Sequence, residues 1–430
     1  MNQEIKIVLP LRYNLVVGDT FQLFYRGIIE APDPFVYDIL LVCEKGKAFP
    51  RYFEFTPEEE GEHILTVSVF DAKKKLLGTN KTILSVKAPK KNTHPLNVLC
   101  MGDSLTAGGQ WPAEAKRRLT SKGGVPFGVG FDNVNFVGTC RSEDVHTGFE
   151  GYGGWLWKSF YSIENNNIWV RTSHNKNVED QHSVWKDEGG NEWKLETLDI
   201  NRLKFLPYGN NSGIKPEKGK LVHVANALHT DDIVFTDSWF EKRSPFYDES
   251  IDDISFKAYS ERIGVDRIDA IYIMLGLNGL LDVKGDILGY CSDVISQAKV
   301  LIDIFHRDFP EGKIKIMGTM MPSVTGGIGA NYGAVMPYCD GYNLRRFVLH
   351  LNELYQELAN EKTYCDFVEH INISGQFDSD NNFPEVEKPV NTRSKKTEKI
   401  GVNGLHPSNE GYMQIADAVF RNMVHLCNDN

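Results

Sequence analysis

The sequence predicts an α/β protein with an all-β region at its N-terminal end. From Leu96 onward, strand-like apolar runs alternate with segments of helical periodicity, which is typical of a parallel sheet flanked by helices. Residues 1–88 instead contain short β-branched or aromatic runs separated by turn residues. The chain has 430 residues, and because one core rarely grows beyond about 250–300 residues, we expect two or three domains.

The N-terminal region contains five strand-like runs, at 21–25, 37–43, 52–55, 63–70 and 81–86. Turn residues such as Gly18, Gly61 and Gly78 lie between them. Five or more strands in so short a segment predict a β-sandwich of immunoglobulin-like size over residues 1–88. Residues 88–95 are polar and flanked by proline, which is the composition of a linker.

The α/β region, residues 96–430, begins with a strand. Further strands follow along the chain, so that the predicted set is 96–101, 134–137, 268–275, 314–317 and 367–371. Apolar residues at helical spacing predict helices at 112–119, 287–305, 344–358 and 407–426. Pro112 suits the first turn of its helix, where no N–H is needed. We therefore expect one parallel sheet with helices packed on it.

One segment, about 159–248, does not follow this alternation. It has no helical periodicity, and it contains four tryptophans, Trp169, Trp185, Trp193 and Trp239, among repeated Asn-Asn and Gly-Gly turns. We interpret it as a β-rich insertion into the α/β domain.

The composition excludes some classes of protein. With 47 basic and 58 acidic side chains the formal charge is −11, which disfavours a protein that binds phosphate backbones. No apolar stretch is long enough to span a bilayer, and no signal peptide is recognisable, so we expect a cytoplasmic chain or the mature form of a secreted one. The seven cysteines are scattered without C-x-x-C spacing, which gives no support for a zinc ribbon or a redox motif.

The motif Gly102-Asp103-Ser104-Leu105 directly follows the first strand of the α/β region. Because reactive groups gather at the carboxyl ends of strands in open parallel sheets, Ser104 lies where a nucleophile is expected. Serine attacks only when a base takes its proton, so the motif requires a histidine elsewhere in the chain. Gly, Asp and Ser are also common turn residues, and a plain strand-ending turn is the alternative interpretation.

Three further blocks could complete such a site. The candidate base is His406, which precedes Pro407 at the start of the last predicted helix. Asn278 follows the predicted strand 268–275, and its amide could donate to a developing oxyanion, an interaction typically worth about 10²–10³ in kcat. The glycine-rich loop 151–154 could bring a backbone N–H to the same oxyanion, since glycine lets the backbone approach closely.

Along the chain, Ser104 belongs to the first block, the loop 151–154 is the second, Asn278 belongs to the third and His406 to the fourth. In this order the four blocks resemble the GDSL (SGNH) hydrolase family of esterases and lipases. The resemblance covers the α/β region from its first to its last element, interrupted by the insertion. It implies a flavodoxin-like three-layer α/β/α domain in which Ser104 is the nucleophile and His406 is the general base. Gly154 and Asn278 correspond to the family's oxyanion donors, which act with the Ser104 N–H, and Gly151 is the alternative to Gly154.

The sequence departs from the family pattern in the third and fourth blocks. Gly279 follows Asn278 where the family usually has Asp, and Asn403 occupies the position three residues before His406 where the family usually has Asp. In serine proteases, replacing the triad Asp by Asn lowers kcat about 10⁴-fold.

Two substitutes for the missing acid come into question. A backbone carbonyl could accept the proton on the second ring nitrogen of the histidine, or an acid from another loop, such as Asp378 or Asp380, could do so. We favour a Ser104–His406 dyad with a carbonyl acceptor, and we therefore expect weak activity in which Asn403 has little part.

The resemblance implies ester hydrolysis through an acyl-enzyme, with no metal and no organic cofactor. An N-terminal β-sandwich and a glycine-aromatic second block look like the carbohydrate-deacetylating branch, so removal of acetyl or other short acyl groups from a carbohydrate is the favoured reaction. Trp155 and Trp239 are candidate substrate-binding residues, because exposed indoles stack on sugars, although tryptophan is more often buried. Two alternatives stay open: a non-catalytic glycan-binding or surface-attachment protein on a hydrolase fold, and an acyltransferase that uses the same site.

Overall fold

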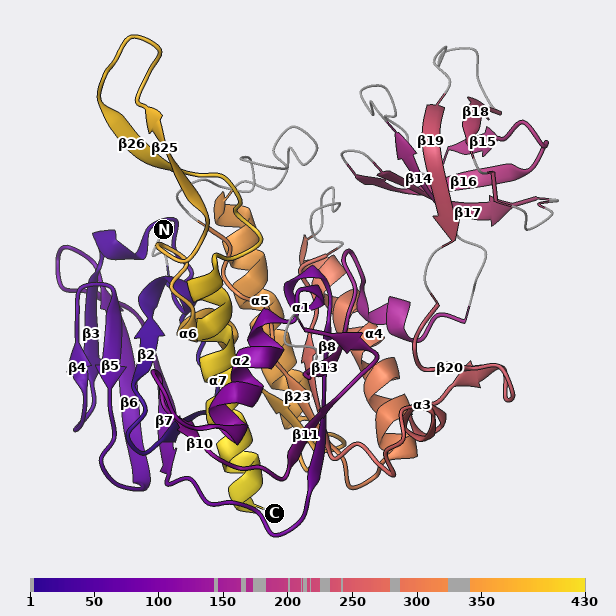
Figure 1. Cartoon of the computed structure of the whole chain (residues 1–430). Helices are drawn as coiled ribbons and strands as arrows, with labels where there is room; N and C mark the ends of the chain where they lie inside the picture. The colour runs from indigo at the N-terminus through magenta and orange to yellow at the C-terminus, as the bar shows by residue number, and fades with distance from the viewer. Residues whose placement is uncertain are drawn as a thin grey trace. The chain divides into compact units, whose positions relative to one another are not determined.

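Two compact units make up the chain in the computed structural model (Figure 1). The first contains Met1–Phe160 and Ser255–Asn430, and the second contains Tyr161–Ile254. The structure describes residues 4–142, 146–163, 168–172, 183–199, 202–209, 211, 215–216, 218–224, 233–240, 243–278, 287–323 and 341–429. The mixed α/β class predicted from the sequence is confirmed, with many strands and several helices.

Two small sheets form the N-terminal part of the first unit. One has the order β1 (Arg12–Val16), β7 (Leu76–Lys87), β6 (Gly61–Phe70) and β3 (Asp38–Val42), and the other β2 (Phe21–Phe24), β5 (Tyr52–Phe55) and β4 (Lys47–Ala48). Single 3-10 turns lie at Tyr25–Gly27 and Pro34–Val36. Residues of β6 alternate between solvent and core with the period of two that a half-buried strand requires. Side chains from both sheets share one apolar core, to which Leu15, Phe21, Phe53, Val67 and Leu84 contribute.

A larger sheet, parallel apart from β12, forms the centre of the first unit. Its order is β12 (Cys140–Arg141), β13 (Gly148–Gly151), β8 (Leu96–Gly102), β22 (Ala270–Met274), β23 (Lys313–Ile316) and β24 (Val368–His370), with β11 (Val134–Val137) also paired to β8. The β8, β11, β13, β22, β23 and β24 pairings are parallel. Every residue of β22 is buried, as expected for a strand covered on both faces.

The helices of the first unit pack on its sheets and on one another. They are α1 (Ser104–Ala107), α2 (Gln110–Thr120), α3 (Phe256–Arg262), α4 (Ile287–Asp308), α5 (Gly341–Asn360), α6 (Ile373–Gln376) and α7 (Asn409–Asp429). Within the described residues α2 packs against α7, and α4 packs against α5. Smaller elements are the 3-10 helix Trp157–Phe160 and the strand pairs β9 (Lys122–Gly123) with β10 (Gly128–Val129) and β25 (Glu385–Pro389) with β26 (Thr397–Gly401).

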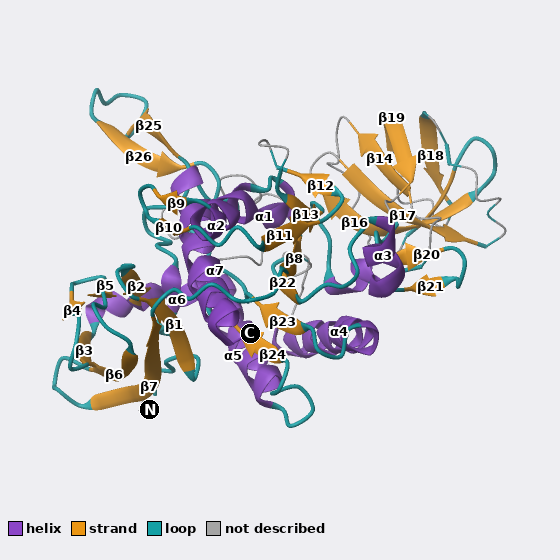
Figure 2. Ribbon diagram, turned by 60° about the horizontal axis from the view of Figure 1, so that its bottom comes forward, coloured by secondary structure: helices purple, strands orange, loops and turns teal. Residues whose placement is uncertain are grey.

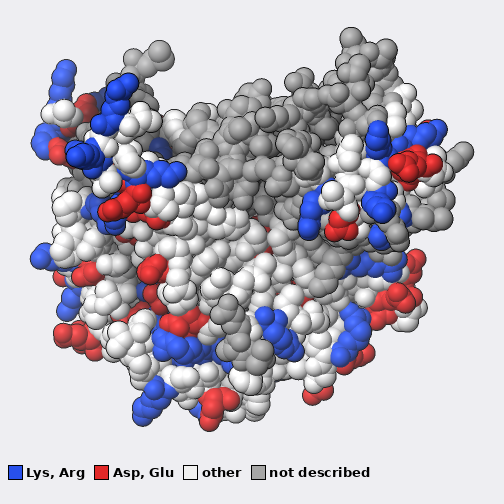
Figure 3. Space-filling model, turned by 45° about the horizontal axis from the view of Figure 1, so that its top comes forward, with Lys and Arg blue, Asp and Glu red and all other residues white. Residues whose placement is uncertain are grey.

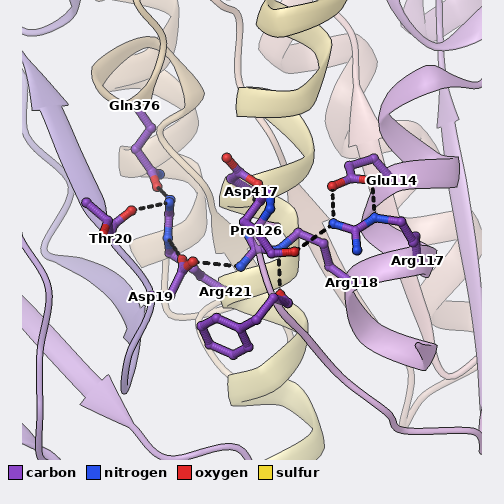
Figure 4. Close-up of polar contacts among 10 residues, drawn as sticks. Asp19, Thr20, Glu114, Arg117, Arg118, Pro126, Gln376, Asp417 and Arg421 are labelled. Atoms are coloured by element: carbon purple, nitrogen blue, oxygen red, sulfur yellow. Dashed lines mark hydrogen bonds and ion pairs between the residues drawn. The ribbon is translucent and has the colours of Figure 1, made fainter. Parts of the chain in front are cut away.

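A buried ionic network joins the N-terminal sheets to α2 and α7 (Figure 4). The carboxylate of Asp19, which is 5% exposed, accepts from Arg118 Nη2 at 2.6 Å and from Arg421 Nε at 2.7 Å. Arg118 also donates to Asp417 at 2.7 Å, and Arg421 donates to Gln376 at 2.9 Å. Strands β1 and β7 contact α7, and β2 contacts α6, so the N-terminal sheets lie directly against these helices (Figure 2).

The second unit is a closed six-stranded barrel with its own core. Its strands, in order around the barrel, are β14 (Ile168–Thr172), β17 (Arg202–Tyr208), β16 (Glu192–Asp199), β15 (Val184–Lys186), β18 (Gly219–His223) and β19 (Ile233–Phe240). Apolar side chains fill the interior, among them Ile168, Trp193, Phe205 and Leu221. The same unit contains the strand pair β20 (Tyr247–Asp248) and β21 (Asp253–Ile254).

The charged surface is mixed in sign. On the face drawn in Figure 3, Lys and Arg side chains are interspersed with Asp and Glu among the described residues. None of the helices in the described ranges combines the length and the hydropathy needed to cross a bilayer.

Candidate active site

Ser104 lies just after the carboxyl end of β8, which is an interior strand of the parallel sheet. The strand ends at Gly102, and Ser104 is the first residue of α1. Asp103 caps this helix, because its carboxylate accepts a hydrogen bond from Leu105 N at 2.9 Å. A Cβ at Gly102 would lie 2.5 Å from the Met274 carbonyl oxygen, so only glycine lets β8 and β22 lie this close. Strand pairing and the helix cap together fix Ser104 at this edge of the sheet.

His406 lies beside the serine. Its Nε2 is 2.9 Å from Ser104 Oγ, although the two residues are 302 positions apart in the sequence. The histidine belongs to the loop between β26 and α7 and is partly buried. Burial lowers the pKa of His406, because desolvation disfavours the imidazolium ion. A histidine that stays neutral to lower pH is suited to the work of a general base.

Asn403 contacts the other ring nitrogen of His406. Its Oδ1 accepts hydrogen bonds from the backbone nitrogens of Leu405 at 3.1 Å and of His406 at 2.9 Å. Its Nδ2 lies 3.4 Å from His406 Nδ1. Because the side-chain oxygen is occupied by the backbone, the amide turns its donor end toward the histidine. No backbone carbonyl or carboxylate in the described part of the chain is hydrogen-bonded to His406 Nδ1.

The two acids considered as substitutes lie with arginines instead. The Asp378 carboxylate accepts from both terminal nitrogens of Arg51, at 3.1 Å each. Asp380 is paired with Arg26 at 2.7 Å and with Arg51 at 3.1 Å. Both carboxylates are therefore used to hold N-terminal arginines.

Asn278 follows β22 and faces the turn that carries the serine. Its Nδ2 donates to Asp103 Oδ2 at 3.0 Å and to the Trp155 carbonyl at 3.2 Å. Gly276, two residues before it, has a φ of +127° and would place a Cβ 2.7 Å from the Tyr355 hydroxyl, so the turn requires glycine. Both amide hydrogens of Asn278 are engaged, and one bond must open before this amide can serve an oxyanion.

The glycine-rich loop borders the nucleophile. Gly151 pairs with Gly102 across β13 and β8, and a Cβ on Gly151 would lie 2.7 Å from Ala107. A Cβ on Gly153 would lie 3.9 Å from Ser104 Cβ, whereas one on Gly154, with φ +81°, would meet nothing within 4 Å. Gly153, which the sequence interpretation passed over, is thus also a candidate oxyanion residue.

Glu150 connects the glycine-rich loop to neighbouring segments through hydrogen bonds. It is fully buried and accepts hydrogen bonds from Thr139 N and from the Tyr259 hydroxyl, each at 2.6 Å. The Tyr152 hydroxyl also bonds to this carboxylate. Burial, followed by the charge of Glu150, raises the pKa of both tyrosines, which keeps their hydroxyls as donors. Sequence reasoning missed Glu150, because a single acid between Gly148 and Gly151 gives no local signal.

The predicted sugar-binding tryptophans have different surroundings. Trp155 is 7% exposed, and its ring packs against Tyr152 at 4.1 Å and Phe160 at 4.8 Å between centroids. Trp239 belongs to β19, where its backbone pairs with Trp169, and its side chain lies outside the described residues. Stacking of a sugar on either residue stays a prediction.

Asp103 lies between Ser104 and Asn278 and is buried. Desolvation raises its pKa to about 7, against the opposing effect of hydrogen bonds from backbone N–H groups. The site therefore contains a serine in contact with a histidine. The Asn278 amide is hydrogen-bonded to Asp103, the residue next to the serine, and the glycine-rich loop lies beside them. These are the parts required for nucleophilic acyl transfer.

Comparisons with known proteins add fold-level likenesses. No protein-family model matches the sequence, and no curated protein sequence matches it. The structure is similar to a carbohydrate acetylesterase family member from Sinorhizobium meliloti, with 15% identity, a TM-score of 0.33 and coverage of 78% of this chain and 100% of that one. It is also similar to a peptidoglycan O-acetylesterase, with 10% identity, a TM-score of 0.27 and coverage of 78% and 93%. These TM-scores are low, so the functional conclusion depends on the site alone.

Proposed function

We propose that this chain is a serine ester hydrolase of the SGNH type, which removes acetyl or other short acyl groups from a carbohydrate through an acyl-enzyme. The observation that carries the proposal is the 2.9 Å contact between Ser104 Oγ and His406 Nε2 at the carboxyl end of a parallel strand. The proposal includes a flavodoxin-like three-layer domain preceded by an immunoglobulin-like β-sandwich.

The reaction would proceed in two halves. Ser104 Oγ attacks the acyl carbon while His406 Nε2 takes its proton, and His406 then returns that proton to the leaving alcohol. Water, activated by the same histidine, hydrolyses the acyl-enzyme. The negative charge on the carbonyl oxygen would be held by the N–H groups of Ser104 and Gly154 and by the Asn278 amide. Asn403 supplies no carboxylate for the imidazolium ion, so weak activity is expected.

The Ser104→Ala variant is the first test. We expect turnover of p-nitrophenyl acetate to fall at least about 10³-fold, because the nucleophile is lost. Circular dichroism should be unchanged, since the hydroxyl of a strand-end serine contributes little to the core. Ser121→Ala, at the exposed end of α2, is the matched control and should keep full activity. Near-wild-type turnover of Ser104→Ala, or labelling of another residue by a fluorophosphonate probe, would refute the assignment.

The pH dependence of kcat/KM should follow His406. Only the neutral imidazole accepts the serine proton, so activity is full above its pKa and is lost as the pH falls through it. Because burial lowers this pKa, the inflection should lie below the ordinary value of 6.5. Asp103 titrates near 7, and the Asp103→Asn variant should remove any second inflection there. An inflection above 6.5 that persists in Asp103→Asn would contradict the role of His406.

The donor end of Asn403 beside His406 also favours one alternative, a non-catalytic glycan-binding protein on a hydrolase fold. That alternative predicts binding of an acetylated oligosaccharide without release of acetate, and no labelling of Ser104 by the fluorophosphonate. An acyltransferase, in contrast, would transfer the acyl group when a sugar acceptor is added to the p-nitrophenyl acetate assay.

A further inference from the structure

The orientation of the Asn403 amide determines which nitrogen of His406 carries the proton. Its oxygen accepts from two backbone N–H groups, and only the oxygen can accept, so the NH₂ group must face His406 Nδ1, 3.4 Å away. A donor beside Nδ1 favours the tautomer in which Nδ1 has no proton and Nε2 carries it. In that tautomer Nε2 donates to Ser104 Oγ and cannot take its proton.

A carboxylate at position 403 would reverse this arrangement. One oxygen would keep the hydrogen bonds from Leu405 N and His406 N, and the other would accept from His406 Nδ1–H. The lone pair on Nε2 would then face Ser104 Oγ, and the negative charge would stabilise the imidazolium ion. Replacing the NH₂ group of residue 403 by an oxygen therefore converts a site in which His406 cannot accept the Ser104 proton into one in which it can.

The residue after Asn403 makes that exchange chemically accessible. Gly404 has no side chain to hinder attack by its backbone nitrogen on the Asn403 side-chain carbon. Its N–H has no hydrogen-bond partner among the described residues, so the nitrogen is not committed elsewhere. The two N–H groups on Asn403 Oδ1 polarise the carbon that would be attacked. Asn403 is partly exposed, so water can reach it.

We propose that Asn403–Gly404 is a deamidation site, and that conversion of Asn403 to aspartate switches the Ser104–His406 pair to its reactive tautomer. This inference rests on the proposed ester hydrolase function. The sequence contains two Asn-Gly pairs, and the asparagine of each, Asn278 and Asn403, belongs to the candidate site.

The reaction needs only water. The Gly404 nitrogen loses its proton and bonds to the Asn403 side-chain carbon, and the amide nitrogen leaves as ammonia, which closes a succinimide ring. Water then adds to the side-chain carbonyl and opens the ring to aspartate, or it adds to the backbone carbonyl and gives isoaspartate. One water is consumed and one ammonia is released. Isoaspartate lengthens the backbone and would displace His406, so only the aspartate product activates.

The second pair, Asn278–Gly279, provides an internal comparison. The Asn278 amide donates to Asp103 Oδ2 at 3.0 Å, so a carboxylate there would face another carboxylate. Deamidation at Asn278 should therefore inactivate the site, whereas deamidation at Asn403 should activate it. Peptide-level assignment of the modified residue is needed to separate the two effects.

The test compares freshly purified full-length protein with protein incubated at mildly alkaline pH in ¹⁸O-labelled water. Peptide mapping by mass spectrometry should show ¹⁸O incorporation at position 403, and p-nitrophenyl acetate turnover should rise in proportion to its aspartate fraction. The Asn403→Asp variant should exceed fresh wild type at least about 10²-fold in kcat. Asn403→Gln, which lacks the geometry for rapid ring closure, should show no rise in activity with incubation.

A spectroscopic measurement makes the inference independent of turnover. ¹⁵N NMR of the histidine ring should find His406 protonated on Nε2 in fresh protein and on Nδ1 in Asn403→Asp. The inference is overturned if position 403 stays unmodified after incubation, or if Asn403→Asp keeps the Nε2-protonated tautomer. If position 403 converts and the tautomer switches but no variant hydrolyses esters, the switch stands and the proposed hydrolase function fails.

Discussion

The N-terminal sheets and the inserted barrel are both all-β, yet they satisfy their buried carboxylates in different ways. In the barrel, Asp187 accepts from Asn191 N at 2.9 Å and from Trp193 Nε1 at 3.0 Å, partners within six positions in the sequence. In the N-terminal region, Asp19 accepts from Arg118 and Arg421, which lie 99 and 402 positions away. The barrel is closed on itself, whereas the N-terminal sheets belong to the body that carries the candidate site.

The partners of Asp19 show why this difference concerns function. Arg118 belongs to α2, which follows the short helix that begins at Ser104. Arg421 belongs to α7, which follows the loop of His406. One carboxylate of the N-terminal region therefore holds both helices that leave the candidate site, and the N-terminal sheets act as a structural part of the first unit.

The Asp19→Ala variant should have the largest effect on stability. Removing Asp19 leaves the buried Arg421 without its carboxylate and leaves Arg118 with only Asp417, and breaking a buried ionic network typically costs about 3–5 kcal/mol. Urea unfolding should therefore show a clear drop in the free energy of unfolding of the first unit. Asp38→Ala is the control, because Asp38 is exposed and pairs with Lys74 at the surface, and it should change little. Equal stability of the two variants would show that the N-terminal sheets are an independent domain.

The Arg51→Ala variant should have a smaller effect, seen mainly in catalysis. Arg51 holds Asp378, whose segment supports the histidine loop through the hydrogen bond from Ser408 N to Asn382 O at 2.9 Å. We expect kcat for p-nitrophenyl acetate to fall about tenfold with little change in KM, because a misplaced base slows the reaction more than it weakens binding. The surface residue Arg12, paired with Glu62, gives the control variant Arg12→Ala. A change confined to KM would contradict a positioning role.

Removing the barrel should have the smallest effect. Replacing residues 161–254 by a short Gly-Ser linker should change the stability of the first unit by less than about 1 kcal/mol, because the barrel has its own core. Turnover of p-nitrophenyl acetate should stay within about threefold of wild type, and the isolated barrel should unfold cooperatively. Loss of cooperative unfolding in the shortened chain would show that the two units depend on one another.

Local patterns predicted most elements of the α/β region. The expected strand 96–101 corresponds to β8 at Leu96–Gly102, and the expected helix 344–358 lies within α5 at Gly341–Asn360. Such elements can be recognised in the sequence because their apolar residues repeat with the period of the helix or strand. Strand β13, Gly148–Gly151, was missed, since a strand with glycine at both ends has no such pattern.

The sequence predicted some residues of the candidate site but not the contacts that depend on the folded chain. Ser104 follows a recognisable strand and His406 precedes a recognisable helix, so the sequence could single them out, and the fold then places their side chains 2.9 Å apart. The Asp19 network had no signal, because its partners meet only after the chain has folded. Likewise, the sequence reveals Asn at position 403 but not the direction of its amide, which depends on two backbone N–H groups of the folded loop.

The span of the Asp19 network has a consequence for biosynthesis. Arg421 is synthesised 402 residues after Asp19. The N-terminal sheets can form early, but a carboxylate destined for burial waits without its second arginine until α7 has emerged. The first unit therefore completes its assembly only after α7 has been made, and until then Asp19 has Arg118 as its ionic partner but lacks Arg421.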